Sequence, residues 1–131
     1  MQDITLAHPL DNRRPTLEAI PRQSDENGGG VIFGGWTLSY MDIAAGKCAF
    51  KEAKQRVTTV GVDKMRFIKP VFVGDPVCFY TKLHALGTTS LTIEVDVFSH
   101  YQSKDLRQVA IGLYSFVALD EHRKPAKLKL D

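Results

Sequence analysis

The chain has 131 residues, about the length of one ordinary domain, so the sequence predicts a single domain over residues 1–131. Hydrophobic residues make up 44% and charged residues 24%, which is typical of a globular protein and excludes a disordered or fibrous one. With 17 Lys and Arg against 15 Asp and Glu, the net charge of +2 is too small to predict a nucleic-acid partner.

Several further classes of protein are disfavoured because the sequence lacks their characteristic motifs. No stretch approaches the roughly 18 apolar residues of a membrane span, and residues 1–10 lack the order of a secretion signal, so we expect a cytoplasmic protein. Cys48 and Cys78 show no CxxC spacing and are expected to be buried free thiols. The four histidines are scattered, which predicts no metal site. Neither a GxSxG element nor a phosphate-binding loop followed by Lys is present.

The first half of the chain predicts one long helix after a glycine-rich loop. Residues 1–12 carry no sustained hydrophobic period and are expected to be a loose lead-in, followed by a short strand within 16–20. Residues 21–30 are polar and then glycine-rich, so they predict a loop with backbone conformations that other residues avoid. Residues 36–53 have helical hydrophobic spacing on more than one face, which predicts a helix of about five turns that is buried on most sides.

After Arg56 the hydrophobic pattern changes to period two, which predicts strands. Four are expected, within residues 60–67, 77–83, 91–97 and 109–117, the first with a register slip near Asp63. Residues 121–131 are expected to be a second loose, solvated end. A helix that is apolar on most sides must be surrounded by sheet, so the predicted fold class is α+β, with one central helix wrapped by a curved antiparallel sheet of about five strands.

Seven short motifs occur in a characteristic order: residues 25–27 (DEN), 32–36 (IFGGW), 41–42 (MD), 57–60 (VTTV), 65–70 (MRFIKP), 73–75 (VGD) and 87–90 (GTTS). Together they resemble the hotdog-fold acyl-CoA thioesterases of the YciA type, over residues 21–119. The resemblance implies a hotdog fold, two chains paired into one continuous sheet, and further assembly to a tetramer or hexamer. It also implies hydrolysis of acyl-CoA thioesters with no cofactor, since CoA is part of the substrate.

The resemblance also implies roles for individual residues. The family's catalytic carboxylate follows a Met on the central helix and falls on Asp42. An Asn in the preceding loop falls on Asn27, and the glycine pair before the helix falls on Gly34 and Gly35. The sequence departs from the family where residues 29–31 read Gly-Gly-Val, so Gly29 and Val31 replace an Asn and an acidic residue.

The residues themselves agree with a hydrolytic role for Asp42, which is the single acidic residue between Trp36 and Phe50. Small neighbours on the same helix leave room for an acyl-pantetheine arm beside it. Asp42 is therefore predicted to be the general base that activates water or, as the alternative, the nucleophile. A structural aspartate paired with a cation is the competing interpretation.

The remaining catalytic candidates have similar alternatives. Backbone N–H groups at Gly34 and Gly35 lie at the positive end of the predicted helix and suit a developing oxyanion, although a plain loop-to-helix junction explains the glycines equally well. Asn27 is predicted to orient the water or the carbonyl group, with a role in a turn as its alternative. For the substrate's remaining contacts, the candidates are Gly34, Thr59, Arg56, Arg66, Lys69, Thr88, Thr89 and Ser90.

Two other functions stay open at this point. One is a non-catalytic protein that binds acyl-CoA or an acyl carrier, in which Gly29 and Val31 mark lost chemistry. The other is a purely structural oligomeric module, which explains the helix and the strands but leaves the isolated Asp42 on an apolar helix unexplained.

Overall fold

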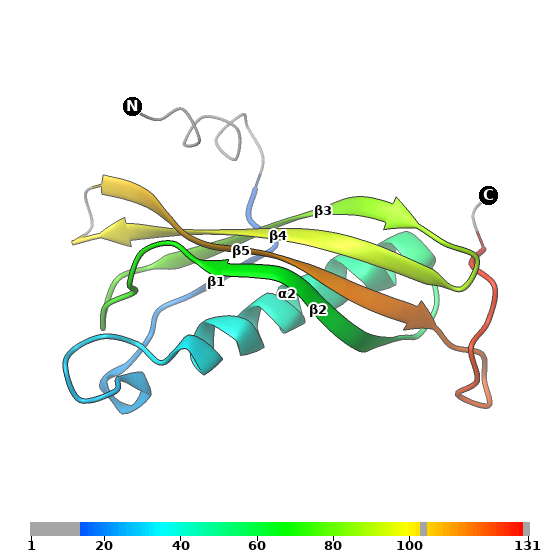
Figure 1. Ribbon diagram of the computed structural model, residues 1–131, viewed down its shortest axis with the longest axis horizontal. Helices are drawn as coiled ribbons and strands as arrows, with labels where there is room; N and C mark the ends of the chain where they lie inside the picture. The colour runs from blue at the N-terminus through cyan, green and yellow to red at the C-terminus, as the bar shows by residue number, and fades with distance from the viewer. Residues whose placement is uncertain (1–13, 103–104, 130–131) are drawn as a thin grey trace.

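The computed structural model describes residues 14–102 and 105–129, and it has the predicted α+β architecture, one helix against one antiparallel sheet (Figure 1). The elements in chain order are β1 (Leu17–Ala19), the short 3-10 helix η2 (Gln23–Asp25), α2 (Gly34–Ala53), β2 (Val57–Phe67), β3 (Val77–Leu86), β4 (Ser90–Tyr101) and β5 (Asp105–Ala118). The sheet order is β1-β3-β4-β5-β2. The predicted lead-in, residues 1–12, lies outside the described residues.

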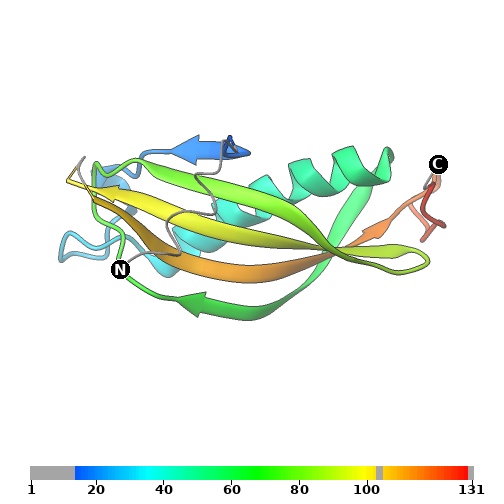
Figure 2. The ribbon, with the colours of Figure 1, turned by 90° about the horizontal axis from the view of Figure 1, so that it is seen from above.

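The sheet curves so that its concave side holds α2 (Figure 2). Alternation along β4 and β5 turns Ile93, Val95 and Phe116 into the core that the helix covers. The predicted register slip is confirmed, because the pairing of β2 with β5 shifts register between Asp63 and Arg66. A second shift lies between Thr59 and Gly61. Such irregularities bend a strand and increase its twist, which helps the sheet to curl.

The helix begins at Gly34, two residues before the predicted start, and is buried along one side only. Met41, Ala45 and Ala49 are fully buried against the sheet, but Ile43 is 48% exposed and Phe50 is 59% exposed. The expectation of a helix buried on most sides is therefore wrong for the single chain. The reason is the size of the sheet, because β1 has only three residues and covers little of the helix's far side.

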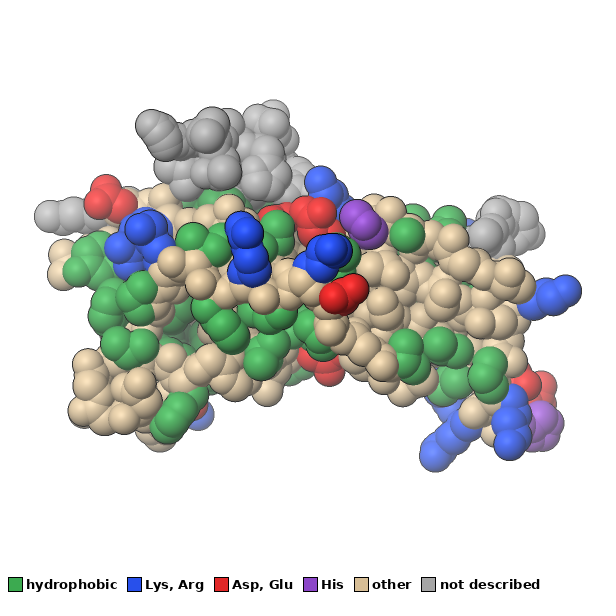
Figure 3. All heavy atoms as spheres, viewed as in Figure 1, with side chains coloured by type: hydrophobic (Ala, Val, Ile, Leu, Met, Phe, Trp, Pro, Cys, Tyr) green, Lys and Arg blue, Asp and Glu red, His purple; other side chains and the backbone are tan. Residues whose placement is uncertain are grey.

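The edge strand β2 is unusually exposed for its length. Nine of its residues are exposed and the other two are half-buried. Its exposed apolar side chains include Val60, Val62 and Phe67, and hydrophobic side chains are visible over the face on which β2 and β5 lie in front (Figures 1 and 3). An exposed edge with apolar side chains is an unfavourable surface for an isolated chain, so it indicates an interface.

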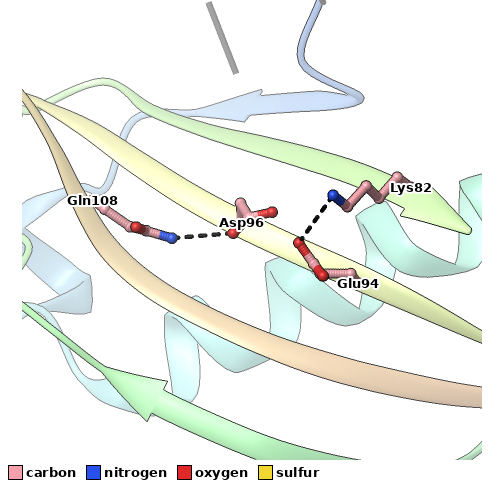
Figure 4. Close-up of polar contacts among 4 residues, drawn as sticks. All are labelled: Lys82, Glu94, Asp96 and Gln108. Atoms are coloured by element: carbon pink, nitrogen blue, oxygen red, sulfur yellow. Dashed lines mark hydrogen bonds and ion pairs between the residues drawn. The ribbon is translucent and has the colours of Figure 1, made fainter. Parts of the chain in front are cut away.

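The convex face of the sheet carries polar contacts between neighbouring strands (Figure 4). Lys82 Nζ on β3 lies 3.7 Å from Glu94 Oε2 on β4. Gln108 Nε2 on β5 donates a hydrogen bond of 3.1 Å to Asp96 Oδ1, also on β4. Both pairs lie on the side away from α2, so they tie the strands together without entering the helix-facing core.

The chain after β5 folds back over the strand ends. Ala126 N donates to Ala118 O at 2.8 Å, and Leu128 N donates to Thr88 O at 3.0 Å. Leu128 also packs against the hydrophobic core. The expected loose end is thus tied down over residues 121–129. The apolar side chain of Leu128 and the backbone hydrogen-bonding groups at the strand ends explain why the chain returns to the sheet. The charged residues that precede Leu128 give no indication of this return in the sequence pattern.

Candidate active site

Asp42 lies on the third turn of α2 and is half-buried. Its Oδ1 accepts a hydrogen bond of 2.7 Å from Thr59 Oγ1 on β2. The carboxylate borders a cavity of about 330 Å³, lined by Leu38, Ser39, Asp42, Thr59, Val62 and Tyr114. Within residues 14–102 and 105–129, no ion pair involves Asp42. The carboxylate is therefore reachable by a ligand and is not neutralised by any cation of the described ranges.

Tyr114 on β5 fixes the helical turn that carries Asp42. The phenol is almost fully buried, and its hydroxyl donates a hydrogen bond of 2.8 Å to the carbonyl oxygen of Leu38. In an α-helix that same carbonyl accepts the backbone N–H of Asp42, four residues later. Burial, and then the negative charge of Asp42, raise the pKa of Tyr114 well above its usual value. Strands β2 and β5 thus each hold this turn through one hydrogen bond.

We expect Tyr114→Phe to lower the free energy of unfolding by about 1 kcal/mol at pH 7, because it removes one buried hydrogen bond and keeps the ring. The pKa of Tyr114 is raised on folding, so its stabilising effect is complete below the unfolded value near 10 and is lost as the pH rises further. Denaturant titrations should show that the difference in free energy of unfolding between the unmodified protein and the variant is smaller above pH 10 than at pH 7. If the two proteins were equally stable at pH 7, the hydrogen bond from Tyr114 to Leu38 would not contribute to stability.

The start of α2 presents backbone donors at Gly34 and Gly35. The preceding residue, Phe33, supplies no side-chain cap, and the first N–H groups of a helix have no partner within it. A Cβ added at Gly35 would meet nothing within 4 Å, whereas one at Gly34 would lie 3.1 Å from the Phe67 ring. Gly35 therefore has the open approach that an oxyanion site requires, and Gly34 is needed for close packing.

Asn27 is exposed and shapes the loop that leads to α2. Its Oδ1 accepts a hydrogen bond of 3.1 Å from Gly29 N, and its own N–H donates to Val31 O at 2.8 Å. Gly28 and Gly30 have φ values of 104° and 83°, which confirms that the loop uses conformations that favour glycine. Within one chain, the oxygen of Asn27 serves the turn, as its competing interpretation predicts.

The three catalytic candidates do not converge on one point of a single chain. Gly35 and Asp42 are seven residues apart on α2, which is about 10 Å along the helix axis. Asn27 precedes that helix start, and the hydrogen bonds given above tie it to its own loop. A thioester beside Asp42 is therefore too far from Gly35 of the same chain for both groups to act on it.

The other candidates lie in three separate places. Arg56 and the turn 88–90 lie at the C-terminal end of α2, because Leu119 N donates to Arg56 O and Ala118 N donates to Thr89 O, both at 2.8 Å. Lys69 lies at the other end, in a cavity of about 370 Å³ that Gly34 also lines. Arg66 lines a cavity of about 520 Å³ with His84 and Glu94, which alternate with the helix-facing residues of their strands.

Sequence reasoning missed Tyr114 and Val62 as site residues. The period-two pattern places Tyr114 on the same face as Gly112 and Phe116, but the pattern does not say which part of the helix it meets. That information lies in the register, in which Val62 pairs with Tyr114 and Thr59 pairs with Phe116.

Neither a reactive thiol nor a metal centre competes with Asp42 in the described part of the chain. Cys48 and Cys78 are both free, as predicted, although Cys48 is only half-buried. Burial raises the pKa of both thiols, which disfavours the reactive thiolate. In the described ranges, no three His, Cys, Asp or Glu side chains come together as metal ligands would. The same ranges hold no helix that is both long and apolar enough to span a bilayer.

A helix held in the concave side of an antiparallel sheet, with one accessible carboxylate facing a strand hydroxyl, defines a hotdog protein with a helix-borne acid site. Residues 29–103 match the thioesterase superfamily, and the chain belongs to this superfamily.

The curated relatives agree with this assignment. The acyl-CoA thioester hydrolase YciA of Escherichia coli is 38% identical over 119 residues, which cover 88% of this chain and 90% of the relative. An uncharacterised acyl-CoA thioester hydrolase of Zymomonas mobilis is 36% identical over 116 residues, 87% of this chain and 77% of the relative. The predicted membership of the YciA-type family is thus confirmed.

Solved structures show the same fold. A hexameric thioesterase from Yersinia pestis is 38% identical with a TM-score of 0.86, over 92% of this chain and 98% of that one. A hexameric hotdog-fold thioesterase of Campylobacter jejuni is 32% identical with a TM-score of 0.82, over 88% and 90%. For an acyl-CoA hydrolase of Staphylococcus aureus, 26% identical with a TM-score of 0.79 over 86% and 69%, structures exist of an aspartate-to-alanine and a threonine-to-alanine variant.

Proposed function

We propose that this chain hydrolyses acyl-CoA thioesters to a carboxylic acid and CoA. The observation that carries the proposal is the Asp42 carboxylate, which is held by Thr59 beside an open cavity and has no cation paired with it in the described residues. A carboxylate in that state can accept a proton. The thioester hydrolase names of the relatives support the same reaction.

In the proposed mechanism, Asp42 removes a proton from a water molecule, whose oxygen attacks the thioester carbonyl. The carbonyl oxygen becomes negative and is stabilised by the backbone N–H donors at the helix start that carries Gly35. The carbon–sulfur bond then breaks, and the CoA thiolate leaves with the proton that Asp42 took from water. Water is the co-reactant, so we propose no cofactor. Thr59 fixes the orientation of the carboxylate through its 2.7 Å hydrogen bond.

The S. aureus hydrolase supports these two assignments. Its two altered positions, an aspartate and a threonine, are 17 residues apart, and the hydrogen-bonded pair Asp42 and Thr59 has the same separation. The alternative role for Asp42 is direct attack, which forms an acyl anhydride with the enzyme. A single turnover in ¹⁸O-labelled water separates the two roles, because a general base puts the label into the released acid at once.

We further propose that each site is completed by a second copy of the chain, paired through β2. The exposed β2 edge and the exposed Ile43 and Phe50 of α2 support this arrangement. A two-fold partner would bring its own Gly35 and Asn27 toward Asp42, which one chain cannot do. Further assembly of these dimers to a hexamer is part of the proposal, supported by the hexameric Yersinia and Campylobacter thioesterases.

The CoA phosphates are proposed to lie at the C-terminal end of α2, near Arg56 and the hydroxyls of Thr88, Thr89 and Ser90. The length of the pantetheine arm supports this location of the phosphates. Eleven residues of helix separate Asp42 from Ala53, about 16 Å. The pantetheine arm has twelve bonds between its sulfur and its phosphate-bearing oxygen, as many as four extended residues, or about 14 Å. Arg66 lies on the convex face of the sheet, and Lys69 lies near the start of α2. Their predicted contacts with the substrate have no support from this distance.

The test of the proposed function is a panel of acyl-CoAs of increasing chain length, assayed with a thiol-detecting reagent. The enzyme should release CoA from at least one of them in a reaction that depends on Asp42. Tight acyl-CoA binding without turnover would instead support the non-catalytic alternative that Gly29 and Val31 suggest. The cytoplasmic location stays a prediction from the sequence.

A further inference from the structure

The cavity of about 370 Å³ at the start of α2 is mostly apolar. Gly34 and Thr37 line it from the helix, and its apolar lining residues include Val31, Ile32, Phe67, Ile68, Val71 and Val109. The cavity beside Asp42 begins about one helical turn further along, where it is lined by Leu38. The two cavities share no lining residue, so they are separate spaces along one side of the same helix.

The order of residues along β2 places Met65 between these two cavities. Val62 lines the cavity beside Asp42, and Phe67 lines the cavity at the helix start. Met65 lies between them, where the pairing of β2 with β5 is irregular. Its side chain is half-buried and packs against the core that α2 covers, so it lies on the same side of the sheet as both cavities.

The thioether of Met65 lies over β5 and close to the helix. A Cβ added at Gly112 would lie 2.9 Å from Met65 Sδ and 3.4 Å from Met41 Cε, so the two methionines share the space that this glycine leaves. Met41 directly precedes Asp42 on α2. A methionine side chain has three rotatable bonds and adapts to irregular spaces, so the thioether can be displaced more easily than a branched or aromatic side chain.

The proposed direction of the CoA arm decides where the acyl chain runs. The two arms of an extended thioester run in opposite directions, so a CoA arm that runs to the C-terminal end of α2 directs the acyl chain toward the helix start. Leu38 is four residues from Asp42, about 6 Å along the axis, and Gly34 is eight residues away, about 12 Å. An extended chain advances about 1.2 Å per bond. Acyl groups of up to about six carbons therefore end before Met65, and those of about ten carbons reach the second cavity.

We propose that Met65 determines which acyl-chain lengths the protein accepts, as a movable partition between the two cavities. The inference rests on the proposed function and names the acyl groups on which it acts. Short chains occupy the cavity beside Asp42 alone. Chains of about eight to ten carbons displace the Met65 thioether and enter the apolar cavity at the helix start. Met65 contacts the acyl chain away from the reacting carbonyl group, so it determines specificity and takes no part in the chemistry.

The test compares butyryl-CoA with decanoyl-CoA in Met65→Phe and Met65→Ala. Met65→Phe puts a rigid ring in place of the thioether, so we expect the ratio of kcat/KM for decanoyl-CoA to kcat/KM for butyryl-CoA to fall at least about tenfold. Each methylene kept out of an apolar cavity loses about fourfold in binding. Met65→Ala removes the partition and should raise the same ratio. The control is Leu17→Ala, which shortens a half-buried side chain of β1 on the same core and should leave the ratio unchanged.

A binding measurement gives a second readout that does not depend on turnover. S-butyl-CoA and S-decyl-CoA are thioethers without the carbonyl group, and the ratio of their Kd values, measured by calorimetry, should show the same preferences. The two Met65 variants change the ratio in opposite directions, which a general loss of stability cannot do.

The outcomes separate this inference from the proposed reaction. Equal losses for both chain lengths, or a ratio that neither variant changes, would overturn the role of Met65 while Asp42-dependent hydrolysis stands. If the protein hydrolyses no acyl-CoA but Met65→Phe still weakens S-decyl-CoA more than S-butyl-CoA, the proposed reaction fails and the partition stands.

Discussion

Replacing Asp42 by asparagine is expected to lower kcat for acyl-CoA hydrolysis by at least about a hundredfold, as the loss of a general base does. Asparagine has the same shape, and its carbonyl oxygen can still accept the hydrogen bond that Thr59 Oγ1 donates over 2.7 Å. The fold and the cavity are thus preserved, and only the ability to take a proton is lost. Initial rates with saturating acyl-CoA measure the effect, and KM should change little.

The matched control for this variant is Glu18→Gln, which removes the same charge elsewhere in the chain. Glu18 is an exposed carboxylate on β1, at the edge of the sheet opposite to the β2 edge that is proposed to pair with a second chain. Its kcat should equal that of the unmodified enzyme. If Asp42→Asn were as active as this control, Asp42 would be neither base nor nucleophile, and its contact with Thr59 would have only a structural role.

The second large effect concerns the sharing of sites between chains. Asn27→Ala and Asp42→Asn should each be strongly impaired, but their coexpression should restore about a quarter of the unmodified activity. In random mixing half of the pairs contain one chain of each kind. One of the two sites in such a pair takes both of its residues from unaltered positions. The measurement is the specific activity of the purified mixture against each variant alone.

A site contained within one chain predicts a different result. Every site in the mixture would then carry one of the two substitutions, and the activity would equal the mean of the two variants. That outcome would refute pairing through β2 as the way in which the site is completed. The geometry argues against it, because the oxygen of Asn27 is bound to Gly29 N and Gly35 lies about 10 Å from Asp42 along α2.

Most of the fold was predictable because it follows from local hydrophobic periods. Alternation along β4 and the helical spacing around Met41 depend only on neighbouring residues. Along β5 the local pattern favours Ile111, Leu113 and Val117, whereas the structure buries Tyr114 and Phe116 instead. The ends of elements were less predictable. The strand β4 extends to Tyr101 and β5 begins at Asp105, because cross-strand hydrogen bonds join backbone groups whatever the side chains are.

The candidate site was predictable where its chemistry depends on residue type. Asp42 stands out as an isolated acid on an apolar helix, and the matched motifs added Thr59. The role of Tyr114 in holding the helix was not predictable, because its hydroxyl donates a hydrogen bond to the carbonyl oxygen of Leu38, which lies 76 positions earlier in the chain. Such a contact depends on the register of three strands and on the placement of the helix over them.

Residue identity and short-range spacing were enough to predict the class of fold, the family resemblance and the acid at position 42. The three-dimensional arrangement was needed to show that Asp42 is accessible, held by Thr59 and separated from Gly35 of its own chain. It also showed that α2 and β2 leave apolar surface uncovered. The physical reason is that burial and hydrogen-bond partners arise from segments far apart in the chain, whose relative positions are set by packing and not by local pattern.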